Sequence, residues 1–234
     1  MPLLSKVVSF DYNKHLPQSS SEKTSDLFFL VTALFIANSK DKEITKLTLQ
    51  KTLFQSVQSL AAKDISFLNT FFFINTYGPF NNIFYQYMEG LEQADLVKTE
   101  GKTIDLTAKG LRVVSDLLSE ISQDTEMQTV LLDLEQRVER YAGDPTKAIN
   151  ETHALRVIDT TNNQKVKTIK ELIKELNPEQ KFITGTQFKY IEPNKKPSKR
   201  VQAPAKTINE LEEILAKVEP SDYEKTSDLS LLFS

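Results

Sequence analysis

This chain has 234 residues, of which 39% are hydrophobic and 26% are charged, and its formal net charge is −3 at pH 7. These values are ordinary for a globular protein that buries a core of its own. The absence of Cys excludes disulfides and thiolate metal sites, and the two His residues, His15 and His153, are far apart in the sequence. We therefore expect neither a metal site nor a bound cofactor.

No apolar run reaches the roughly 18 residues that a membrane-spanning helix needs. The longest candidate, residues 27–37, is interrupted by Thr32 and follows a polar arm with charges of both signs, which is unlike a signal peptide. These observations predict a cytoplasmic protein without a membrane partner.

The charge is distributed unevenly along the chain. Residues 160–206 contain 11 Lys and Arg against 4 Asp and Glu, a net charge of +7, whereas residues 207–234 contain 2 against 7, a net charge of −5. Blocks of one sign indicate solvated, flexible or partner-binding regions.

The first half of the chain begins with an arm over residues 1–24. A helix over 25–38, with Ser25 or Asp26 as its N-cap, is apolar nearly all round, which predicts a central and buried position. The next helix, 46–63, carries apolar residues at spacings of three and four. Four polar positions of this helix are predicted to face outward: Gln50, Gln55, Gln58 and Ser59.

An aromatic run from Ile65 to Tyr77 follows, and its periodicity does not decide between strand and helix, although it predicts burial. Gly78 and Pro79 end the run, because Gly permits a positive φ and Pro suits the first turn of a new helix. The pattern after this break predicts a helix over 80–94, a β-hairpin over 96–106 and a helix over 107–121.

The second half of the chain predicts amphipathic helices over 125–141, 167–176 and 208–218, and a short helix over 145–155 that Asp144 can cap. The apolar stripe on residues 125–141 is narrow, so it should pack on a single surface, and a homodimer contact through this helix stays open. Pro193, Pro197 and Pro204 stand among Lys residues, which predicts an extended and mobile stretch.

Together these elements predict a mainly α protein: a winged helix-turn-helix domain with a small β-hairpin as its wing, followed by additional helices and an extended C-terminal region. The expected parts are an N-terminal arm (1–24), the winged-helix domain (25–122), accessory helices (123–159), a basic linker rich in Pro and Lys with one short helix (160–206), and an acidic C-terminal helix and tail (207–234).

Three short motifs carry a resemblance to known families. Residues 44–54 (ITKLTLQKTLF) are similar to the opening motif of the prokaryotic YwgA-like and phage-associated Panacea-type families, and residues 76–80 (TYGPF) resemble their Tyr-Gly-Pro turn. Residues 106–110 (LTAKG) resemble the segment that follows the wing in many winged-helix proteins. The resemblance covers residues 27–122 and implies a regulatory, antitoxin-like or defence-associated protein, without fixing an activity.

A DNA-binding transcriptional regulator is one functional hypothesis. Helix 80–94 would enter the major groove, but its only charges are acidic, and most DNA affinity comes from neutralised phosphates. The wing 96–106 and the basic segment 189–206 would have to add the cations. The candidate contacts, to nucleic acid or to a protein partner, are Asn81, Asn82, Gln86, Lys98, Lys102, Lys195, Lys196, Lys199 and Arg200.

An enzyme is not expected, because the chain has neither a Gly-rich phosphate loop nor a nucleophile motif. Glu151 and His153 are two residues apart, which random solvated placement explains best, and the aromatic run up to Tyr87 is expected to be core.

The leading hypothesis is therefore a non-enzymatic adaptor or regulator that binds a protein partner through its accessory helices and C-terminal tail. The expected docking residues are Leu211, Ile214, Leu215, Leu231, Leu232 and Phe233.

Overall fold

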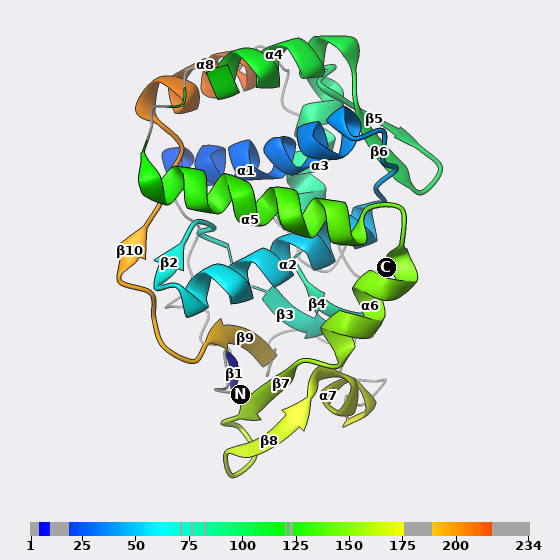
Figure 1. The fold of residues 1–234 in the computed structure, drawn as a ribbon, viewed down its shortest axis with the longest axis vertical. Helices are drawn as coiled ribbons and strands as arrows, with labels where there is room; N and C mark the ends of the chain where they lie inside the picture. The colour runs from blue at the N-terminus through cyan, green and yellow to red at the C-terminus, as the bar shows by residue number, and fades with distance from the viewer. Residues whose placement is uncertain are drawn as a thin grey trace.

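The computed structural model describes residues 5–9, 19–70, 72–75, 77–81, 83–119, 121, 124–175 and 189–216. Helices α1, α5 and α2 run across the middle of the molecule, α4 and α8 lie above them, and a sheet lies below (Figure 1). The elements in chain order are β1 (Ser5–Ser9), α1 (Ser20–Ser39), α2 (Lys46–Ala62), β2 (Ile65–Ser66), β3 (Phe72–Asn75), β4 (Gly78–Phe80), α3 (Ile83–Gln93), β5 (Val97–Glu100), β6 (Thr103–Leu106), α4 (Ala108–Ser119), α5 (Thr125–Tyr141), α6 (Pro145–His153), β7 (Arg156–Asp159), β8 (Lys165–Thr168), α7 (Ile169–Glu175), β9 (Lys189–Pro193), β10 (Lys199–Arg200) and α8 (Ala205–Leu215).

The main sheet has six strands in the order β4-β3-β9-β1-β7-β8. Strands β1 and β7 are parallel, and all other neighbours are antiparallel. Val7 of β1 lies opposite Ile191 of β9, and both side chains are buried together with Val157 of β7. One face of the sheet is therefore buried against the helices, since side chains alternate between the two faces of a strand.

The predicted fold class is wrong. The described residues form a mixed α/β structure with a six-stranded sheet, instead of a mainly α winged helix with a small hairpin. Residues 72–75 and 78–80, where the turn of a helix-turn-helix was expected, form the paired strands β3 and β4 of that sheet. The strands are short and pair across long sequence separations, so local patterns along the chain carry almost no signal of them.

Several individual elements do lie where the sequence places them. Helices α2, α5 and α6 and the β5–β6 hairpin match the predicted segments closely, and Gly101 adopts a φ of +62° in the hairpin turn. Helix α1 is buried on most of its surface, as predicted, because it packs against α2, α4, α5 and α8.

The predicted start of α1 is wrong by more than a turn. The helix begins at Ser20, and Ser19 is its N-cap in a capping box with Glu22. Ser25 and Asp26 are therefore inside the helix, and both are fully buried.

The predicted outward face of α2 is also wrong. Gln50, Gln55 and Gln58 are all buried, since α5, α6 and the strand β4 pack around this helix. The prediction assumed that polar side chains of a helix face solvent. In this protein the side-chain amides of Gln50 and Gln55 form hydrogen bonds inside the protein.

The N-terminal arm and the basic segment both belong to the sheet. Strand β1 lies between β9 and β7, and β9 in turn pairs with β3. The segment that follows β9 is bonded to the rest of the protein, because β10 pairs with β2 and Val201 N–H donates to Ser66 O at 2.8 Å. The chain then enters α8, whose Leu211 packs in the core that contains α1.

Candidate functional site

Two of the motifs recognised in the sequence contact each other. Lys51 Nζ on α2 donates to Pro79 O at 2.6 Å, and the adjacent Gln50 Oε1 accepts the Asn81 N–H at 2.8 Å. Asn81 Oδ1 in turn accepts the Ile83 N–H at the start of α3. Helix α2 therefore holds both ends of the segment that joins β4 to α3.

A cluster of aromatic side chains lies on this segment. The Tyr77 side chain precedes β4 and is 65% exposed, and Tyr85 in the first turns of α3 is 39% exposed. The Phe80 ring lies 5.5 Å from the Tyr85 ring and 5.1 Å from the Phe73 ring. We call Tyr77, Phe80 and Tyr85 the aromatic surface.

The backbone beneath the aromatic surface is tightly constrained. Gly78 has a φ of +90°, and a Cβ atom at this position would lie 3.0 Å from His153 Nε2 and 3.5 Å from Lys51 Nζ. His153 Nε2 also lies 3.3 Å from Tyr77 O, within hydrogen-bonding distance. Only Gly combines this conformation with such a close approach of two side chains.

The electrostatics of this site are unusual. Lys51 is fully buried, and burial lowers the pKa of its ammonium group from 10.5 to about 7. Burial also lowers the pKa of His153, with a further contribution from the charges of Lys51 and Lys170, while the bond to Tyr77 O opposes the shift. Burial thus lowers the pKa of two side chains that contact the backbone at Tyr77 and Pro79.

A second buried polar centre lies at the other side of the helical layer. Asp26 accepts hydrogen bonds from the backbone N–H groups of Asn69 and Thr70 and from Asn69 Nδ2. Burial raises the pKa of this carboxyl group to about 7, although these donors oppose the shift. We assign it a structural role, because it fixes the turn that leads from β2 to β3.

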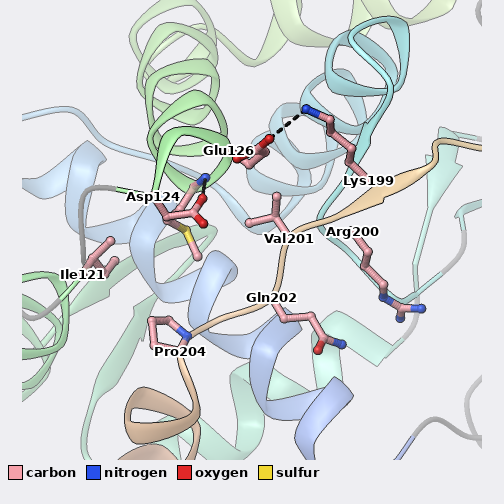
Figure 2. Close-up of a pocket in the computed structure, with 9 residues that line it drawn as sticks. Ile121, Asp124, Glu126, Lys199, Arg200, Val201, Gln202 and Pro204 are labelled. Atoms are coloured by element: carbon pink, nitrogen blue, oxygen red, sulfur yellow. Dashed lines mark hydrogen bonds and ion pairs between the residues drawn. The ribbon is translucent and has the colours of Figure 1, made fainter.

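A shallow groove of about 560 Å³ lies between the N-terminus of α5 and the segment 199–204 (Figure 2). Its floor is apolar, and its rim carries charges of both signs, with Lys199 and Glu126 joined by an ion pair of 2.8 Å. Mixed charges on an open groove do not define one class of ligand. The lining residues are Ile121, Asp124, Glu126, Met127, Lys199, Arg200, Val201, Gln202 and Pro204.

The candidate contacts in the helix-and-wing region are not gathered on one face. Asn81 is buried and caps α3, so it is unavailable to a nucleic acid. Gln86 and Lys102 are exposed, and Lys98 forms an ion pair with Glu100. Asn82 lies outside the described residues.

The cations of the basic segment are largely matched by acidic side chains of the same chain. Lys199 pairs with Glu126, and Arg200 pairs with Glu22. Lys195 lies 4.0 Å from Asp64, and Lys196 is exposed. Since these positive charges are already paired, the segment is less able to neutralise the phosphates of a nucleic acid.

The expected protein-docking residues are mostly packed inside the molecule. Leu211 is fully buried, and Ile214 and Leu215 are partly buried against the same core. The apolar stripe of α5, considered for a homodimer, packs instead on α1 and α2. Leu231, Leu232 and Phe233 lie outside the described residues.

The pair Glu151 and His153 does not form a catalytic arrangement. Glu151 accepts hydrogen bonds from Arg140 and from the Tyr141 hydroxyl group, while His153 contacts the Tyr77 carbonyl. Within the described ranges, no three His, Asp or Glu side chains are grouped so that they could hold a metal ion.

Sequence reasoning named the motifs but missed the site that they build. Lys51 and Tyr77 were used only to recognise a family, and the aromatic run was assigned to the core. The available signal was a Lys between Leu49 and Leu53 of a predicted helix, followed later in the chain by Gly78 and Pro79. Neither the Lys nor the Gly-Pro pair indicates, from the sequence alone, that the helix and the segment at Pro79 are in contact.

Comparisons with protein-family models, with curated proteins and with solved structures found no match to this chain. The resemblance to YwgA-like and Panacea-type families therefore stays a prediction. Of the helices in the described part of the chain, none is long and apolar enough to cross a membrane.

Proposed function

We propose that this chain is a non-enzymatic adaptor or regulator that binds a protein partner through the aromatic surface. The observation that carries the proposal is the exposure of Tyr77, which precedes β4, and of Tyr85, whose ring lies 5.5 Å from that of Phe80. Tyr is enriched among the residues that dominate binding energy, because its ring buries a large apolar area while its hydroxyl group finds a polar partner.

The rigidity of the surface favours the same function. Lys51 and Gln50 bond to the backbone at Pro79 and Asn81, and His153 approaches the Tyr77 carbonyl. A surface held in one conformation before binding loses less conformational entropy when a partner arrives. Exposed aromatic side chains on a mobile loop would lack this advantage.

This proposal replaces the partner surface expected from the sequence. The apolar faces of α5 and α8 pack against α1 of the same chain. They are therefore not available to bind a partner. DNA binding is a weaker explanation, because Lys98, Lys199 and Arg200 are each paired with an acidic side chain.

The test compares the wild-type chain with a Y77S/Y85S variant and with L132S as a matched control. Leu132 is an apolar side chain on α5 that is 55% exposed and outside the aromatic surface. Tagged proteins would capture partners from the native host, and isothermal titration calorimetry would then measure affinity for each captured protein. We expect Y77S/Y85S to weaken binding by about tenfold or more, and L132S to leave it unchanged.

Equal affinity of the wild type and Y77S/Y85S would contradict the proposal. So would an equal loss in L132S, which would indicate a general effect of removing exposed apolar groups. Tight binding to duplex DNA at physiological salt, with a steep loss of affinity as salt rises, would support a DNA-binding regulator instead.

A further inference from the structure

Two ionisable side chains from different helices contact the short edge strand β4. Lys51 of α2 donates to Pro79 O at 2.6 Å, and His153 of α6 lies 3.3 Å from Tyr77 O. Both side chains lie against Gly78, on which a Cβ atom would be 3.0 Å from His153 Nε2 and 3.5 Å from Lys51 Nζ. Both nitrogens therefore lie within 4 Å of the position that a Cβ atom of residue 78 would occupy.

These contacts take the place of a neighbouring strand. Among the strands of the described residues, β4 is at one end of the six-stranded sheet and pairs only with β3. The carbonyl groups of Tyr77 and Pro79 are bonded by side chains instead, which stabilises the exposed edge and blocks it. Loss of these bonds would free the backbone that carries Tyr77 and Phe80.

The neighbouring charges that lower the pKa of His153 are positive. α7 packs on β4 and contributes Lys170, whose charge acts on His153, and β3 contributes no ionisable side chain. Glu151 of α6 is engaged by Arg140 and Tyr141. Among the described residues, no carboxylate group forms an ion pair with Lys51. When Lys51 is protonated, its positive charge is stabilised by its hydrogen bond to the carbonyl group of Pro79 and not by a negative charge.

Protonation should therefore strain the closed arrangement. Lys51 is buried, with a pKa of about 7, so it is neutral at mildly alkaline pH and charged in acid. His153 becomes charged at a lower pH than an ordinary imidazole, because it is partly buried and lies near Lys51. Two like charges in a poorly solvated site repel each other, and opening the turn would return both to water.

We propose that Lys51 and His153 form a proton-sensitive clamp on β4, closed when Lys51 is neutral and loosened when both side chains are charged. The clamp sets the conformation of the backbone under the aromatic surface. Its consequence for partner affinity rests on the function proposed above: binding should weaken as the pH falls from 8 to 5.5. Lys51 acts here as a positioning residue, since it is buried and cannot touch a partner.

The clamp can be tested without any partner. Amide hydrogen exchange of the isotope-labelled full chain, followed by NMR and corrected for intrinsic exchange rates, reports opening at Gly78, Phe80 and Asn81. We expect protection of these amides to fall by about tenfold or more between pH 8 and pH 5.5, the change that one unit of pKa difference produces. Protection that stays constant across this range would overturn the proposal.

Two variants separate the clamp from a merely structural contact. K51M removes the charge but keeps an apolar stem, and we expect the exchange to lose its pH dependence while the pKa of His153 rises. Since the chain has two His residues, H153Q assigns the imidazole signals. K109M is the matched control, because Lys109 Nζ also donates to a carbonyl group, Ala94 O at 2.6 Å, far from β4.

Each outcome bears on the clamp or on the proposed function separately. An unchanged pKa of His153 in K51M, or wild-type pH dependence in both K51M and H153Q, would refute the clamp. If K51M does not fold, the wild-type exchange profile and H153Q still decide. If Y77S/Y85S binds partners normally while the exchange behaves as expected, the clamp stands and the proposed partner surface is wrong.

Discussion

Replacing Asp26 with Asn should change how the stability of this protein depends on pH. Asp26 is fully buried in α1, and its two oxygens accept hydrogen bonds from Asn69 and Thr70. None of the described Lys or Arg residues forms an ion pair with it. Burial disfavours the carboxylate form, whereas the hydrogen bonds favour it, and burial is the larger effect on the pKa.

The sign follows from the two pKa values. The carboxyl group of Asp26 loses its proton near pH 3.8 in the unfolded chain and at about pH 7 in the folded protein. Between these values the folded state binds more protons, so the free energy of unfolding falls as the pH rises. Three units of pKa correspond to about 4 kcal/mol, at 1.36 kcal/mol for each unit.

Urea unfolding followed by far-UV circular dichroism, at pH values from 4 to 8, measures this effect. The free energy of unfolding of the wild type minus that of D26N should decrease by up to about 4 kcal/mol across this range. A constant difference would refute the reasoning. A difference that grows with pH would show that the three N–H donors outweigh burial and hold the pKa below its ordinary value.

Three further predictions test the packing described above, with G90A as the control for the first. G78A should destabilise the fold by more than about 1 kcal/mol, because neither the backbone at φ +90° nor the nearby His153 leaves room for a Cβ atom. G90A is the control, and it should be neutral or stabilising because a Cβ atom there meets open space. Thermal unfolding measures both effects. L211A should lower the free energy of urea unfolding by about 2–4 kcal/mol, since Leu211 is fully buried; a change near zero would place α8 outside the cooperative fold. K199A should leave the melting temperature unchanged, since exposed ion pairs contribute little, and a clear decrease would show that the Lys199–Glu126 pair holds the segment 199–204.

The elements that could be predicted are those whose signal is local. The spacing of apolar residues located α2 and α5, and Asp144 before Pro145 marked the start of α6, where Asp144 accepts the Lys147 N–H. The Gly in the connection between β5 and β6 marked a tight turn. Each of these signals lies within one or two turns of backbone, so no distant residue is needed to read it.

The start of α1 shows how two local signals can compete. Ser25 and Asp26 have the right side chains for an N-cap, but Ser19 and Glu22 form the capping box, and Asp26 bonds to the turn at Asn69. The residues next to Asp26 in the sequence do not show whether its side chain caps the helix or bonds to a distant segment.

By itself, the sequence of this protein determined most of its helices and the β5–β6 hairpin, whereas Gly78 and Pro79, expected to form the turn before a helix, lie in strand β4. Only the tertiary structure decided the six-stranded sheet, because β1, β3, β7 and β9 come from distant parts of the chain and pair by backbone hydrogen bonds that any residue can make. It also decided the candidate site. Lys51, Tyr77 and His153 meet through packing of α2, β4 and α6, and contacts across such separations leave no pattern in a single sequence.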